Sequence, residues 1–281
     1  QDMFLMGAMG PPGGGRTVIS ARLQSRFNLI NMTFPATSQI KRIFSTLINQ
    51  KLQDFDEQMK PIGNVITDAT IELYNGVVQK FLPTPTKIHY LFNLRDISKI
   101  FQGMLRVHKD YHDTKISISR LWVHECFRVF SDRFVDHKDM EMFVVLLNEK
   151  LGIFLDMTFH NLCPNKQSPI FGDFIRGDVY EDLTNFKALK AYMEHQLAEY
   201  NATPGVVSMS LVLFKDAIEH VTRIVRVISQ PRGNMLLVGI GGSGRQSLSQ
   251  LSAFISDYNT YQIEVTKVYR KMEFREGRSE S

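Results

Sequence analysis

The chain has 281 residues, which is enough for one large or two modest domains with hydrophobic cores. Its formal net charge of +4 is small and mixed in sign, which argues against a nucleic-acid partner, and no run of about eighteen apolar residues predicts a membrane span. Two cysteines, Cys126 and Cys163, argue against a disulfide scaffold and are typical of a reducing compartment.

The N-terminal stretch predicts a short strand, a loop and a short helix. Residues 3–9 are apolar, and a run rich in proline and glycine follows. Glycines 13–15 are not interpreted as a phosphate loop, because no Gly-Lys-Ser/Thr follows and the two prolines before them lack N–H donors. A helix over 20–27 would place Arg22 and Arg26 four residues apart on one face, an arrangement that is usual on a solvated surface.

Helical periodicity dominates the middle of the chain and predicts a compact five-helix bundle without a catalytic signature. The expected helices span residues 37–55, 62–81, 93–104, 118–134 and 139–152. Thr37 or Ser38 is expected to cap the first of them.

The third of these helices carries a candidate site residue in its first turn. Asn93 and Asp96 have the spacing of a capping box, and Arg95 lies between them. A cation in the first turn opposes the helix dipole, and a bound anion would offset that cost. The alternative is a surface arginine that pairs with an acid elsewhere.

The C-terminal half predicts a connector followed by alternating helices and strands. Prolines and a glycine within 158–176 indicate irregular structure. A helix is expected over 181–200, a longer helix after the break at 203–205 that runs to about residue 229, and a third helix over 246–256. Strands are expected over 234–239 and 261–265. The polar end, 273–281, predicts low order.

The strongest functional signal is the stretch 234–247, Asn-Met-Leu-Leu-Val-Gly-Ile-Gly-Gly-Ser-Gly-Arg-Gln-Ser. A buried strand, a glycine-rich turn and the start of a helix are the order that a phosphate-binding loop needs. The candidate nucleotide-binding residues are Gly239, Ile240, Gly241, Gly242, Ser243, Gly244, Arg245, Gln246 and Ser247. The alternative is a glycine-rich turn that binds nothing.

The loop departs from the pattern G-x-x-x-x-G-K-[ST] after Gly244. Arg245 stands where lysine belongs and keeps the charge on a planar, bulkier group. Gln246 replaces the Mg²⁺-binding hydroxyl, so any metal contact there would be weaker, and Ser247 is one place late. No acidic pair follows an apolar strand downstream, and the similar run 144–149 is interpreted as the end of a core helix. We therefore expect ATP or ADP binding with impaired or absent hydrolysis, and no ATPase activity from the chain alone.

Other catalytic signals are weak. His108 and His112 are four residues apart, but no third ligand lies nearby in the sequence, so no metal site is predicted. Cys126 lies on an apolar helix face and is interpreted as a core residue rather than a nucleophile.

Three stretches together resemble a dynein heavy chain of the axonemal type. They are Gly7–Arg16 (Gly-Ala-Met-Gly-Pro-Pro-Gly-Gly-Gly-Arg), Phe92–Gly103 (containing Phe-Asn-Leu-Arg-Asp-Ile-Ser and Phe-Gln-Gly), and Leu237–Leu248 around the glycine loop. The resemblance covers nearly the whole chain and implies an α/β fold: a predominantly helical fragment of an AAA+ P-loop NTPase with a helical lid and an incomplete parallel sheet. It implies the end of the third AAA+ large subdomain at 1–35, the lid at 36–157, and the start of the fourth large subdomain at 158–281.

The resemblance also implies roles and partners. Arg26, in preference to Arg22, matches the arginine finger, and Arg95 matches the lid sensor that faces the third module's nucleotide. The implied function is part of a motor that couples ATP hydrolysis to microtubule-based movement of cilia and flagella, located in the cytoplasm, cytoskeleton and axoneme. The implied partners are the rest of the ring, microtubules, and intermediate and light chains. Two alternatives remain: a non-hydrolysing structural or regulatory nucleotide-binding module, and a helical interaction protein.

Overall fold

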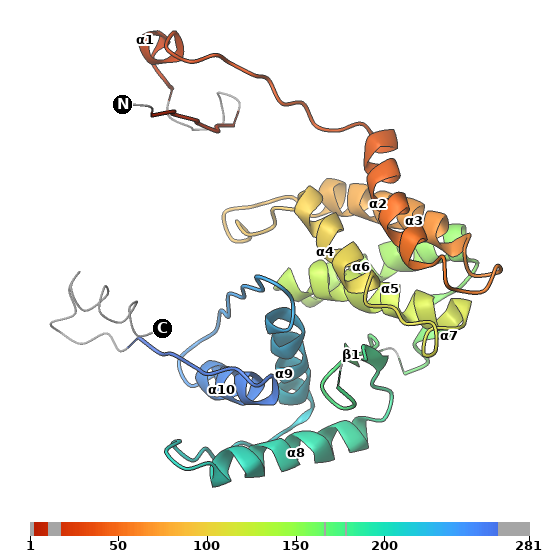
Figure 1. Ribbon diagram of the computed structural model, residues 1–281, viewed down its shortest axis with the longest axis vertical. Helices are drawn as coiled ribbons and strands as arrows, with labels where there is room; N and C mark the ends of the chain where they lie inside the picture. Colours follow the sequence, from red (N-terminus) through yellow and green to blue (C-terminus); the bar gives the residue numbers. More distant parts are fainter. Residues whose placement is uncertain (1–2, 11–17, 166, 178, 264–281) are drawn as a thin grey trace, which may run out of the picture.

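The computed structural model describes residues 3–10, 18–165, 167–177 and 179–263 and shows a mainly helical chain with two hydrophobic clusters (Figure 1). The α-helices are α1 (Ala21–Gln24), α2 (Thr37–Lys51), α3 (Ile62–Lys80), α4 (Leu94–Met104), α5 (Lys115–Val129), α6 (His137–Lys150), α7 (Phe159–Leu162), α8 (Phe186–Ala202), α9 (Lys215–Ile228) and α10 (Arg245–Ile255). The other elements are the 3-10 helix η1 (Ser131–Arg133), the π-helical turn η2 (Leu151–Leu155), and strands β1 (Phe171–Gly172) and β2 (Glu181–Asp182).

The first cluster joins helices α2 to α7 and confirms the predicted helical bundle. The apolar stripes of α3, α4 and α5 are buried against one another, because each repeats with helical spacing. Phe44 of α2 stacks on Phe101 of α4 with ring centroids 4.7 Å apart. Trp122 is fully buried, and its Nε1 donates to Thr70 Oγ1 at 2.8 Å, which satisfies the one polar atom of its ring system.

Capping explains how the starts of α2 and α5 compare with the predictions. Helix α2 begins at Thr37, so neither Thr37 nor Ser38 caps it; the cap position is Ala36, whose N–H donates to Gln39 Oε1 at 2.9 Å. Helix α5 begins earlier than predicted because Thr114 accepts from Ser117 N. The chain after Val129 continues as the separate turn η1.

The second cluster packs α8, α9 and α10 together. Helix α8 begins at Phe186 because Asn185 Oδ1 accepts from Ala188 N at 3.1 Å. The predicted start at residue 181 is wrong, since Glu181 and Asp182 form β2. The predicted connector 158–176 likewise contains α7 and β1.

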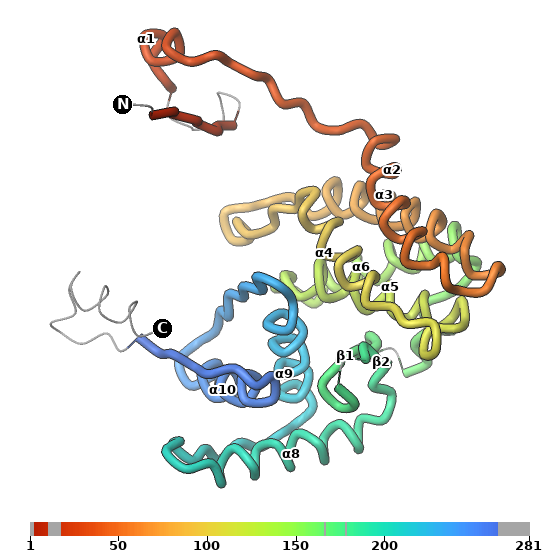
Figure 2. Tube along the Cα trace, viewed as in Figure 1, coloured from red at the N-terminus to blue at the C-terminus, as the bar shows by residue number. Residues whose placement is uncertain are grey.

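The predicted parallel sheet is not formed within the described ranges. Their one sheet is the antiparallel pair β1–β2, with Phe171 opposite Asp182, between the two groups of helices (Figure 2). Residues 3–9 and 234–239 have no hydrogen-bonded neighbouring segment and therefore do not form the predicted strands. A strand forms only where a partner satisfies its N–H and C=O groups. The predicted strand 261–265 is also unpaired over 261–263, and its last two residues lie outside the described part, as do glycines 13–15 and the tail 273–281.

Residues 18–36, before α2, form an exposed arm. Helix α1 has four residues, and Figure 1 shows it at the far end of this arm, away from the helices of both clusters. Among the described residues, no helix is long and apolar enough to span a membrane.

Candidate functional site

The glycine loop forms a sharp connection between an extended segment and α10. Gly242 and Gly244 have φ angles of +78° and +77°, a region that side chains other than glycine rarely adopt. A Cβ on Gly239 would lie 2.8 Å from Ser243 Oγ, so the loop closes tightly on its own first residue. These glycines therefore permit the turn, as the sequence pattern predicts.

The backbone amides of the loop are available to a ligand. Helix α10 begins after Gly244 with no side-chain cap. Within the described part of the chain, the N–H groups of 241, 242 and 244–247 donate to no backbone carbonyl, whereas Ser243 N donates to Ile240 O at 3.3 Å. Residues 241–247 are exposed or half-buried. A helix N-terminus with free, solvent-facing donors favours an anion such as phosphate.

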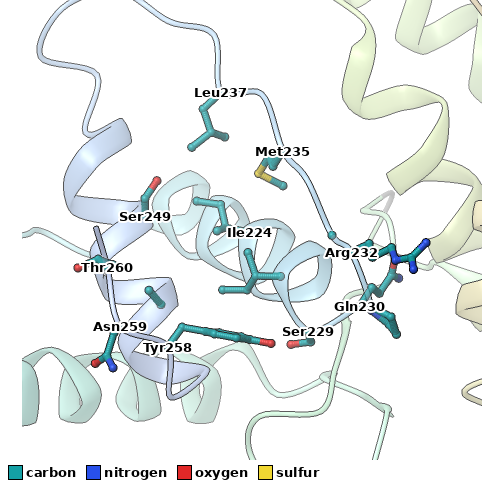
Figure 3. A pocket seen from close by; sticks show the side chains of 14 residues that line it. Ile224, Ser229, Gln230, Arg232, Met235, Leu237, Ser249, Tyr258, Asn259 and Thr260 are labelled. Atoms are coloured by element: carbon teal, nitrogen blue, oxygen red, sulfur yellow. The ribbon is translucent and has the colours of Figure 1, made fainter. Parts of the chain in front are cut away.

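A hollow near this region lies away from the loop. A cavity of about 730 Å³ opens beside the first half of the extended segment, between α9 and α10, where Ile224, Met235 and Leu237 face it (Figure 3). None of residues 239–247 lines it; the nearest lining residues are Leu237 before the loop and Ser249 in α10. Because ligands of α/β folds bind at the carboxyl ends of strands, this cavity is not the phosphate position.

Exposure along the extended segment alternates as in a strand. Met235 and Leu237 are 38% and 36% exposed, whereas Leu236 and Val238 are 87% and 86% exposed. One face thus looks toward α9 and α10, and the other is open. The predicted burial of this strand is therefore wrong for the described chain, since nothing covers its second face.

Arg245 turns back toward the loop. Its Nη2 donates to Ile240 O at 3.3 Å, and the residue is exposed. The guanidinium therefore lies beside the free amides and adds positive charge where a phosphate would sit. Gln246 is exposed at the next position, which places an amide where the usual motif has a hydroxyl.

The capping box that precedes Arg95 is formed as predicted. Asn93 Oδ1 accepts from Arg95 N, and Asn93 N donates to Asp96 Oδ2, both at 2.9 Å. Arg95 itself is exposed and has no ion pair among the described residues. The alternative, a surface arginine paired with an acid, is therefore not seen in this part of the chain.

Arg22 and Arg26 lie on the exposed arm, apart from the glycine loop. Arg22 is in α1, but α1 ends at Gln24, so Arg26 follows the helix and does not share a helical face with it. The expected helix over 20–27 is wrong because Ser20 caps a single turn. The arm, α4 and α10 are separate in space (Figure 1), so these arginines and the loop do not form one site within this chain.

A buried ionic cluster escaped the sequence analysis. Glu125 of α5 is 0% exposed, and its carboxylate accepts from Arg226 of α9 and, at 2.8 Å, from Tyr180 Oη. His124 contacts Tyr180 Oη at 3.0 Å and donates through Nδ1 to Pro169 O at 2.8 Å. The available signal was a charged residue at a core position: Glu125 shares its face with Leu121, and a buried carboxylate requires a cation.

Burial sets the proton affinities in this region. It lowers the pKa of His124 well below its usual value, and the nearby guanidinium groups of Arg128 and Arg226 lower it further. It disfavours the charged form of Arg226, but the Glu125 carboxylate outweighs this effect and raises the Arg226 pKa. Arg226 therefore stays charged while His124 stays neutral.

Both cysteines are buried thiols, which confirms the interpretation of Cys126 as a core residue. Burial raises the pKa of Cys126 well above its usual value and raises the pKa of Cys163 to about 11. A thiol in this state is a poor nucleophile. Among the described residues, no group of three or more His, Cys, Asp or Glu side chains could hold a metal ion.

We expect acid to destabilise this chain partly through its buried histidines. Burial lowers the pKa values of His112 and His124, so the unfolded state, with histidine pKa values of about 6.5, binds more protons. Their contribution is complete above that pH and is lost as the pH falls below it. His124→Gln should flatten the plot of unfolding free energy against pH between about 7 and 5. The matched change at exposed His195 should leave that slope unchanged, and equal slopes in both variants would contradict the assignment.

Comparison with known families places the loop in context. The chain matches a P-loop containing dynein motor region over residues 1–35, an AAA+ lid domain over 66–162, and a P-loop containing dynein motor region D4 over 209–278. It is 73% and 71% identical, each over 277 residues, to dynein axonemal heavy chain 2 of Mus musculus and Homo sapiens. It is 48% identical over 282 residues to the Dynein-1-beta heavy chain, flagellar inner arm I1 complex, of Chlamydomonas reinhardtii.

The loop geometry, the helical bundle and these matches define an AAA+ P-loop protein, a class in which such loops bind nucleotides. The chain belongs to the dynein heavy chain family, and it corresponds to part of the motor region of the axonemal members. These alignments cover 98% of the chain and 6% of the length of each relative.

Proposed function

We propose that this chain contributes to an axonemal dynein motor that couples ATP binding and hydrolysis to microtubule-based movement of cilia and flagella. The observation that carries the proposal is the loop at 239–247, whose free amides and left-handed glycines lie in the stretch that matches the D4 motor region. In this proposal, residues 1–35 end the third AAA+ large subdomain, 36–157 form its lid, and 158–281 begin the fourth large subdomain.

Each arginine then serves a different nucleotide. The loop binds the phosphates of ATP or ADP, with Arg245 in place of the usual lysine. Gln246 gives Mg²⁺ only a weak contact there. Arg26, in preference to Arg22, acts as an arginine finger for the nucleotide of the preceding module, and Arg95 acts as the lid sensor of the third module. The exposure of all three arginines and the separation of their elements support this division.

The proposed partners are the remaining parts of the motor ring, microtubules, and intermediate and light chains. The proposed location is the axoneme within the cytoskeleton. The relatives named axonemal and flagellar support this location.

A second candidate is a nucleotide-binding module that stays loaded and does not hydrolyse ATP. The amide of Gln246 at the usual hydroxyl position favours it, because an amide oxygen there makes a weaker contact with Mg²⁺ than the usual hydroxyl. This candidate predicts nucleotide affinity that is independent of Arg26.

Titration with fluorescent ATP and ADP analogues tests the proposed site. We expect saturable binding by the purified chain without steady phosphate release above that of Gly244→Asp. In a relative's motor region carrying this sequence over the aligned stretch, Arg26→Ala should slow microtubule gliding. Absence of saturable binding would overturn the nucleotide site and favour a helical interaction protein, and gliding that is indifferent to Arg26 would favour the non-hydrolysing module.

A further inference from the structure

We propose that Arg133 is a positioning residue for Arg95. It fixes the direction of the first turn of α4, so that the Arg95 side chain faces the phosphates of the third module's nucleotide. The inference rests on the proposed sensor role of Arg95 and adds a residue that touches no nucleotide itself.

The contact between Arg133 and Asp96 is the first support. Asp96 is 2% exposed and already accepts from Asn93 N within the capping box. The guanidinium of Arg133 reaches both carboxylate oxygens of Asp96: Nη2 donates to Oδ1, and Nη1 lies 3.3 Å from Oδ2. A two-pronged contact of this kind restricts rotation of the carboxylate more than a single point charge would.

Arg133 also holds the chain that enters α4. Its Nη1 donates to Leu91 O at 3.2 Å, and its guanidinium lies over the Phe92 ring, 5.2 Å from the centroid. In return, His89 Nε2 contacts the backbone carbonyl of Arg133 at 2.9 Å. The residues on both sides of the Asn93 cap are thus attached to η1, an element 37 residues away from Asp96 in the sequence.

These contacts orient the helix start rather than create it. The capping box closes between Asn93, Arg95 and Asp96 without Arg133. The box alone does not join the turn to the bundle, whereas the burial of Ile97 and the attachment to η1 do. Because the Arg95 N–H is part of the box and its side chain is exposed and unpaired among the described residues, a tilt of this turn moves the side chain directly.

Lys99 provides a matched comparison. Among the described residues it also forms an ion pair with Asp96, but its Nζ is 3.8 Å away and its side chain is 56% exposed. Removing Lys99 changes the charge around Asp96 by the same unit and leaves the two-pronged contact intact.

The test measures the affinity of a fluorescent ADP analogue for the third module, in a relative's motor region carrying this sequence. The phosphate loops of the other modules are inactivated, including Gly244→Asp in this chain. Arg95→Ala and Arg133→Gln should each weaken binding about tenfold, and the double variant should be no weaker than Arg95→Ala alone. Lys99→Gln should leave the affinity within about twofold.

The double variant separates positioning from general stability. A residue that only stabilises the fold would weaken binding by the same factor whether or not Arg95 is present, so additive effects would overturn the inference. Normal affinity in Arg133→Gln would also overturn it. If Arg133→Gln melts below the assay temperature, Arg133→Lys replaces it, and it should lose affinity in an Arg95-dependent manner. Unchanged affinity in Arg95→Ala would instead sink the proposed sensor role, which is a separate result.

Discussion

Arg226→Met should lower the free energy of unfolding by about 3–5 kcal/mol, because it leaves the buried carboxylate of Glu125 without its cation. The remaining neighbours cannot replace it. Tyr180 Oη supplies one hydrogen bond, and burial together with the surrounding arginines keeps the pKa of His124 low, so His124 stays neutral. Because Glu125 lies in α5 and Arg226 in α9, the substitution weakens the contact between the two hydrophobic clusters.

Urea unfolding followed by tryptophan fluorescence measures this effect. The sequence has a single tryptophan, Trp122, which is fully buried on α5 one turn before Glu125. Arg223→Met is the matched control, since Arg223 lies one turn earlier on α9 and its contacts with Asp132 and Glu219, at 3.5 and 3.2 Å, are only half-buried. That control should cost at most about 1 kcal/mol.

The double replacement Glu125→Leu with Arg226→Met sharpens the interpretation. Removing both charges avoids the unpaired carboxylate, so the double variant should be more stable than Arg226→Met alone. Equal losses in Arg226→Met and Arg223→Met would show that Glu125 is reached by water and that the pair does not behave as a buried one.

The same carboxylate explains a glycine in the Phe-Gln-Gly stretch. A Cβ built on Gly103 would overlap the carboxylate of Glu125, which Arg226 and Tyr180 hold in place. Helix α4 therefore needs a residue without a side chain at this position, so that it can approach α5 closely. This glycine serves packing around a buried charge rather than a turn.

Features governed by residues close in sequence could be predicted. The capping box at Asn93 and Asp96, the burial of Cys126 and the helical identity of 144–149 depend on spacings within one or two turns. The glycine loop also belongs to this group, since its left-handed angles follow from the positions of Gly242 and Gly244.

Features that join distant segments could not be predicted. Glu125 and Arg226 are 101 residues apart, and no local pattern pairs them. The contact between Arg133 and Asp96 likewise links two elements that periodicity describes only separately. The prediction of strand pairing is wrong for the same reason. The segment 234–239 has the composition of a strand, but pairing depends on a neighbouring strand that the described ranges do not supply.

Gly244→Asp should weaken binding of a fluorescent ADP analogue by at least about hundredfold. At about 4 Å from a phosphate, a carboxylate costs about 4 kcal/mol at an intermediate dielectric, and exposure at the loop reduces this through screening. The new side chain also occupies the position just before the free amides at the start of α10. The loss should shrink as salt is raised, because part of it is electrostatic.

Gly205→Asp is the control that separates an effect on the phosphate site from the general effects of backbone strain and added charge. Gly205 has φ of +86°, close to the +77° of Gly244, and a Cβ there meets no atom within 4 Å. Both variants therefore introduce the same charge and a similar backbone strain, which aspartate tolerates better than most residues. Equal affinities in the two variants would mean that the amides of 241–247 do not hold the phosphate, whereas a loss confined to Gly244→Asp would locate the phosphate at the start of α10.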